Sequence, residues 1–264
     1  MKKNLIITAL VAASFTLPSV FAGNSGHKGG TDILHFFVRK TMSNAGVVPE
    51  AVGRIDGKRA LQGNADNQKL DINLQNLATN ATYHLSAIIG DGTNFTEILD
   101  FGTNEKGSAK LQYRRMGANG SHGLGHGKTA LPAALNPISN IRELAIFDTN
   151  AQLVLSADLT APDKLQYLVK RSLTNDGVET NAAASLRVKG TTDSTQFRLL
   201  ASGLQSGASY SLVINGNVDE TKVAEADGKL NFTNLLVTSS DILDVRTLAL
   251  WNSTSNSVLS TQLP

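Results

Sequence analysis

The chain of 264 residues contains no cysteine and few aromatic residues. The absence of thiols excludes disulfides, thiolate nucleophiles and cysteine-ligated zinc sites. Aromatic residues make up 5% of the chain, and Trp251 is the only tryptophan. Trp251 stands in an alternating apolar segment, so we expect it to pack in a core rather than to form a sugar-stacking platform. Carbohydrate binding then depends on polar Asn and Asp loops.

Long apolar runs are also scarce, and a short one opens the chain. Residues 5–13 are almost entirely apolar, Lys2 and Lys3 precede them, and the small residue Ala22 ends the following segment. The run is too short to span a bilayer, and the whole pattern is typical of a secretory signal peptide. We expect a Sec signal cleaved after Ala22, export to the periplasm or the extracellular space, and no stable membrane insertion.

An excess of charge of one sign is absent as well. The chain has 24 Lys and Arg residues and 22 Asp and Glu residues. Cleavage after Ala22 removes Lys2 and Lys3 and leaves the mature chain formally neutral. The balance therefore predicts no binding of nucleic acid and no electrostatic attraction to anionic lipid. The basic pairs Arg39-Lys40 and Lys170-Arg171 are interpreted as charges that protect sheet edges from aggregation.

What the chain does contain is an internal repeat. Residues 38–47 match residues 169–178, and residues 141–148 match residues 245–252, with apolar and turn positions in register. Chance similarity rarely keeps register over separate blocks, so the sequence predicts an internal duplication.

Strand-like patterns fill both copies. Apolar and polar residues alternate with period two, for example over residues 70–74, and Gly or Asn turns recur between such segments. Tyr83 and Tyr210 occupy matching positions and are expected in the core. The sequence predicts an all-β fold of two tandem Ig-like β-sandwich domains related by internal duplication. The predicted segments are a signal peptide (1–22), a flexible N-terminal segment (23–30), copy one (31–160) and copy two (163–264).

The copies differ most in one loop. Copy one carries a Gly/His-rich insertion of 15 residues near 115–131, and it contains His122 and His126. Imidazole is a ligand for Zn, Cu or Ni, and His27 in the N-terminal segment offers a further donor. These three histidines are the predicted metal ligands. The alternative interpretation of the loop is a solvated hairpin tip that contacts a partner.

These patterns favour an exported, non-catalytic β-sandwich protein with a binding, adhesive or envelope-structural role. Its ligand would be a protein or a carbohydrate, and no catalytic or cofactor-binding residue is predicted. One alternative is a periplasmic metal-binding protein that uses the His122/His126 loop. Another is a hydrolase whose site is assembled only by folding and is not readable from the sequence.

Overall fold

The computed structural model describes residues 32–63, 65–115, 128–233 and 245–263. These residues form β-strands β1 to β19 and two single turns of 3₁₀ helix, without any α-helix. No helix in this part of the chain is long and apolar enough to cross a membrane. The prediction of an all-β protein is confirmed.

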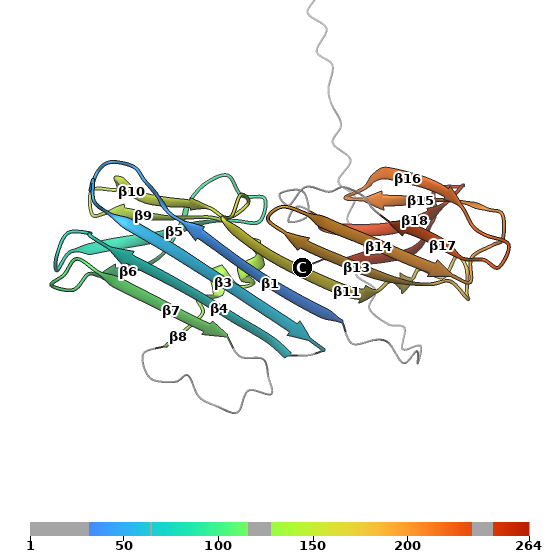
Figure 1. Ribbon diagram of the computed structural model, residues 1–264, viewed down its shortest axis with the longest axis horizontal. Helices are drawn as coiled ribbons and strands as arrows, with labels where there is room; N and C mark the ends of the chain where they lie inside the picture. The colour runs from blue at the N-terminus through green and yellow to red at the C-terminus, as the bar shows by residue number, and fades with distance from the viewer. Residues whose placement is uncertain (1–31, 64, 116–127, 234–244, 264) are drawn as a thin grey trace, which may run out of the picture.

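The strands form three sheets (Figure 1). The large sheet has nine strands in the spatial order β17 (Leu230–Thr233), β14 (Thr195–Ser202), β13 (Ala183–Thr191), β11 (Lys164–Ser172), β1 (Ile33–Thr41), β3 (Val52–Gln62), β4 (Ala65–Gln75), β7 (Ala109–Arg115) and β8 (Thr129–Ala130). One five-stranded sheet has the order β2 (Ser43–Asn44), β10 (Leu153–Asp158), β9 (Ile141–Asp148), β5 (Thr82–Ile89) and β6 (Thr96–Gly102). The other has the order β12 (Thr174–Asn175), β19 (Ser257–Gln262), β18 (Thr247–Asn252), β15 (Ser209–Ile214) and β16 (Asn217–Val223).

Antiparallel pairing of β1 with β11 makes the large sheet continuous across the molecule. Phe36 is directly opposite Tyr167, and Leu34 is directly opposite Val169. All four side chains are buried, and directly opposite residues of a ladder point to the same side of the sheet. Both small sheets therefore cover the same side of the large sheet (Figure 1). We call the other side of the large sheet the open face.

This central pairing corrects one interpretation of the sequence. The basic pairs Arg39-Lys40 and Lys170-Arg171 were expected to protect sheet edges, but β1 and β11 are the central strands of the nine. The edge interpretation is wrong because the edge position of a strand depends on its neighbours in space. The pairing that removes both edges joins β1 to β11, which lie more than 100 residues apart in the chain.

The two matched tyrosines are buried, as predicted. Tyr83 is 3% exposed and Tyr210 is fully buried. Each hydroxyl accepts a hydrogen bond from a backbone N–H, from Ala78 at 3.0 Å and from Gln205 at 2.9 Å respectively. Burial, reinforced by a hydrogen bond to the Glu179 carboxylate, raises the pKa of Tyr210 to about 12. Both side chains are therefore part of the core, and Tyr210 is a neutral phenol at neutral pH.

The expectation for Trp251 is wrong. Leu248 and Leu250 of β18 are buried, whereas Trp251 alternates with them and is only partly buried. Its ring therefore lies on the outer face of the small sheet, outside the core.

The segment that follows the predicted Gly/His-rich insertion is built into the core. Residues 116–127 lie outside the described residues, but residues 133–140 form two 3₁₀ turns that bury Leu135 and Ile138. The side chain of Gln68, 3% exposed, holds this segment against the sheet. Its amide nitrogen donates to Asn136 Oδ1 at 2.8 Å, and its oxygen accepts from Ile138 N at 2.9 Å. Residues 133–140 thus have a structural role, which says nothing about the insertion itself.

We expect Gln68→Leu to lower the free energy of unfolding by about 1–3 kcal/mol, because it leaves buried polar groups without partners. Urea unfolding of the mature chain measures this. Thr195→Val is the matched control, because the buried Thr195 hydroxyl has no partner in the described structure. That substitution should leave stability unchanged or raise it. Equal losses in both variants would contradict the role given to Gln68.

Candidate functional site

The predicted metal ligands His27, His122 and His126 lie outside the described residues. Within those residues, two other arrangements of polar side chains have geometry that suits ligand binding. One is the open face of the large sheet, and the other is a histidine–carboxylate cluster on a small sheet.

Basic residues are concentrated on the open face. Among the described residues, strand alternation and register place 11 Lys and Arg residues there, but only two acidic residues, Asp56 and Asp71. The strands of the described sheet present the following basic residues on that face: Arg39, Arg54, Lys58, Lys69, Lys110, Arg114, Lys164, Lys170, Arg187, Lys189 and Arg198. A chain of nearly balanced charge therefore has one strongly cationic surface.

One row of these cations crosses three strands. Lys58 on β3 is opposite Lys69 on β4, which is opposite Arg114 on β7. Like charges placed directly opposite each other destabilise a sheet. A single carboxylate reduces the repulsion here, because Asp71 lies 2.7 Å from Lys69 Nζ and 2.6 Å from an Arg114 guanidinium nitrogen.

The titration of Asp71 reflects this position. Burial alone would raise the pKa of its carboxyl group, but hydrogen bonds from Lys69 and Arg114 hold the pKa below its ordinary value. The carboxylate is therefore ionised at neutral pH. The single negative charge of Asp71 forms ion pairs with both Lys69 and Arg114. Lys58 has no carboxylate partner among the described residues.

A groove of about 710 Å³ follows this row across β11, β1, β3, β4 and β7. The Phe37 ring lies in it, with Lys58 Nζ 5.2 Å and the Arg39 guanidinium carbon 5.8 Å from the ring centroid. The two cations are held over an aromatic face, and His35 and Lys164 also line the groove. Such a surface suits a ligand with negative groups and an apolar or ring-shaped body.

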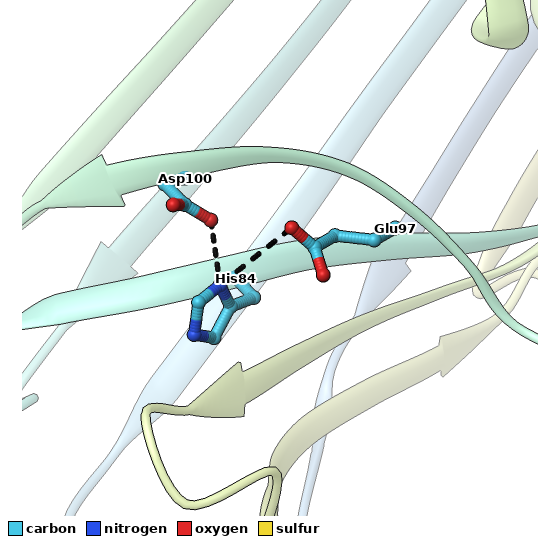
Figure 2. A group of neighbouring side chains, drawn as sticks. All are labelled: His84, Glu97 and Asp100. Atoms are coloured by element: carbon cyan, nitrogen blue, oxygen red, sulfur yellow. Dashed lines mark hydrogen bonds and ion pairs between the residues drawn. The ribbon is translucent and has the colours of Figure 1, made fainter.

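The second arrangement lies on the neighbouring strands β5 and β6, and Figure 2 shows its three side chains. His84 Nδ1 is 2.5 Å from Asp100 Oδ1 and 3.9 Å from Glu97 Oε1. The ligand atoms of the three residues lie within 4.8 Å of one another. His84 is directly opposite Asp100 in the ladder, so both side chains leave the same face of the small sheet. One imidazole and two carboxylates are a donor set that zinc accepts.

No family model matches the chain, and no curated protein sequence and no solved structure shows significant similarity to it.

The sequence contains a pattern that predicts the cationic open face, but the net charge of the whole chain does not show it. In residues 54–58 the polar positions Arg54, Asp56 and Lys58 alternate with buried Ile55 and Gly57. The same alternation recurs in β13, where Arg187 and Lys189 are the outward residues. Counting charge by strand face, rather than over the whole chain, would have found the cationic surface. The sequence alone would still not have shown that these strand faces lie in one sheet, because that depends on the pairing of β1 with β11.

Asp71→Asn should lower the free energy of unfolding at pH 7 by about 1–3 kcal/mol, because it leaves Lys69 and Arg114 opposed without a carboxylate. The folded-state pKa of Asp71 is lowered, so its contribution is complete above the ordinary carboxyl pKa of 3.8 and is lost as the pH falls through the lower folded value. The deficit of the variant should therefore shrink below about pH 4.

Urea unfolding at several pH values tests this prediction. Asp227→Asn is the control, because Asp227 forms an exposed pair with Lys229 that contributes little. A deficit in Asp71→Asn that does not change between pH 7 and the acid range would contradict the role of the Asp71 carboxylate.

Proposed function

We propose that the protein is an exported, non-catalytic binding protein that holds an anionic ligand on the open face of its large sheet. The observation that carries this proposal is that the described strands place 11 basic residues and two acidic residues on one face. Folded surfaces ordinarily mix both signs, and a face of one sign attracts ligands of the other. The predicted signal peptide supports a place outside the cytoplasm.

We also propose that the large sheet joins two tandem β-sandwich domains, Ig-like in character and derived from one duplicated unit. Equivalent turns support this proposal. Asn44 Nδ2 donates to Ala51 O at 2.8 Å, and Asn175 Nδ2 donates to Ala182 O at 2.7 Å. In both turns the asparagine side-chain oxygen also accepts a backbone N–H from the glycine two residues later. The order in which strands join the sheets is likewise the same in both halves, apart from β8.

The first test uses the mature chain, residues 23–264, which is formally neutral when the histidines are uncharged. A uniform distribution of charge would give no retention on a sulfonate cation exchanger at pH 7. The segregated distribution should give retention that salt reverses, because exposed charges are screened by ions. Elution is followed as a function of ionic strength.

A matched pair of variants locates the contact. Lys58→Gln/Lys164→Gln removes two open-face charges, and Lys106→Gln/Lys229→Gln removes two charges from exposed turns. The first pair should elute at clearly lower salt than the second, although the net charge is the same. Flow-through of the unmodified chain, or identical elution of the two variants, would overturn the proposal.

A second candidate function, binding of a divalent metal ion, is favoured by the cluster of His84, Glu97 and Asp100. Zinc bonds of about 2.0–2.2 Å in tetrahedral geometry place ligand atoms about 3.3–3.5 Å apart. The separations of 2.5 and 3.9 Å from His84 Nδ1 lie on either side of that value. Small side-chain rotations would therefore produce three zinc ligands, with the fourth position left to water.

Calorimetric titration of the mature chain with Zn²⁺, Cu²⁺ and Ni²⁺ tests this candidate. We expect one site that disappears in His84→Ala and persists in His122→Ala/His126→Ala, with Cu²⁺ bound at least as tightly as Zn²⁺. Loss of binding only in the double variant would move the site to the Gly/His-rich loop. No heat of binding in the unmodified chain would remove the metal function.

A further inference from the structure

We propose that the ligand of the open face is a linear acidic polysaccharide long enough to cross both halves of the sheet, and that Lys170, Arg187 and Arg198 form its second binding row. This inference rests on the proposed function and adds a second site and a class of ligand to it. Lys170 on β11 is directly opposite Arg187 on β13, and Arg187 is directly opposite Arg198 on β14.

The second row lacks the neutralisation found in the first half. All three side chains are exposed, and none forms an ion pair with any residue of the described structure. Directly opposed like charges destabilise the free sheet. An anionic group bound between them relieves that repulsion and gains charge-assisted hydrogen bonds to two guanidinium groups.

The corresponding row in the first half shows that the strand geometry does not require three cations. Arg39 on β1 is opposite Asp56 on β3, and Asp56 is opposite Asp71 on β4. Arg39 Nε also donates to Asp56 Oδ1 at 2.6 Å. The second half thus carries two arginines at the register positions where the first half carries two aspartates. Strand pairing therefore does not require the arginines of this row, and their charges are available to bind an anion.

The spacing of the two rows sets the size of the ligand. Six inter-strand gaps separate β7 from β14, and each gap is about 4.8 Å. The row on β3, β4 and β7 meets β1 at Phe37, and the row on β11, β13 and β14 meets it at Ile33. Across the sheet and along the strands together, the far ends are therefore about 30 Å apart. Only an extended anion reaches both.

The shape of the face favours a polymer over a bilayer. Adjacent strands in a sheet rotate by about 20–25°, so cations on seven successive strands do not lie in one plane. A flexible chain follows that twist, whereas a flat membrane touches it only locally. Membrane-surface proteins also insert large apolar side chains. Among the described residues, one exposed large apolar side chain, Val52 at the start of β3, is on the open face. The others lie on loops or on β16: Val47, Phe95, Val178, Val218 and Val223.

The side chains between the cations favour a saccharide over a nucleic acid. Proteins that bind single strands stack bases on several aromatic rings, but Phe37 is the only Phe, Tyr or Trp side chain that the described strands present on the open face. Amide side chains alternate with the cations instead, and amides both donate to and accept from sugar hydroxyls. The outward amides are Gln62, Asn67, Asn73, Gln75, Gln112, Gln166, Gln196 and Asn231.

The experiment measures binding of the mature chain to heparin, used as a long acidic polysaccharide, and to a sulfated disaccharide that is too short for both rows. We expect the long chain to bind at least tenfold more tightly per molecule, because its second contact is intramolecular. Anionic phospholipid vesicles and single-stranded DNA are titrated in the same buffer and should bind more weakly than heparin.

The variant Arg187→Gln/Arg198→Gln tests the second row, with Lys106→Gln/Lys229→Gln as the control of equal charge. We expect the arginine variant to lose about three- to thirtyfold in affinity for heparin and the control to change by less than twofold. Because neither arginine has a partner in the described structure, the thermal midpoint of the free chain should not fall.

The outcomes separate this inference from the proposed function. If no anion binds, the proposed function itself fails. If heparin and the disaccharide bind alike, or the arginine variant behaves like the control, the second row is wrong while anion binding stands. If vesicles or DNA bind more tightly than heparin, the ligand class is wrong.

Discussion

The antiparallel pairing of β1 with β11 is the contact on which the rest of the structure depends. Seven residue pairs, from Ile33–Lys170 to Arg39–Lys164, join the two halves. Because opposite residues of a ladder point to the same side, this one pairing places both small sheets on one side and both sets of outward residues on the other. Unpaired, β1 and β11 would each be an exposed edge, and no continuous cationic face would exist.

The pairing is also close to symmetric. Phe36 and Tyr167 hold equivalent positions in the proposed duplication, since Val38 aligns with Val169, and these two residues are directly opposite each other. The halves are thus related like the subunits of a twofold dimer. Under such symmetry a cation kept in both copies, such as Arg39 and Lys170, appears twice on the same face. Duplication therefore doubles any outward charge that both copies keep. The aspartates Asp56 and Asp71 reduce the positive charge of the open face in the first half only.

The sequence allowed the strands and much of the core to be predicted, but not the way the halves meet. Period-two alternation identified residues 70–74 as a strand, and matched positions identified Tyr83 and Tyr210 as buried, because both signals are local. β1 and β11 pair across more than 100 residues of chain, and no local pattern ranks such pairings. That is why Arg39-Lys40 was interpreted as edge protection. The open face was missed for the related reason that it exists only once distant strands are placed side by side.

Balanced net charge does not weaken the argument for anion binding, because a ligand responds to nearby charges rather than to their sum. At physiological ionic strength, screening limits the range over which exposed charges interact to about 8 Å. Packed sheets lie about 10 Å apart. Carboxylates on the outer faces of the small sheets, such as Glu97 and Asp100, are separated from the open face by both layers. An anion near Arg187 and Arg198 therefore meets an almost purely cationic field, whatever the total for the chain.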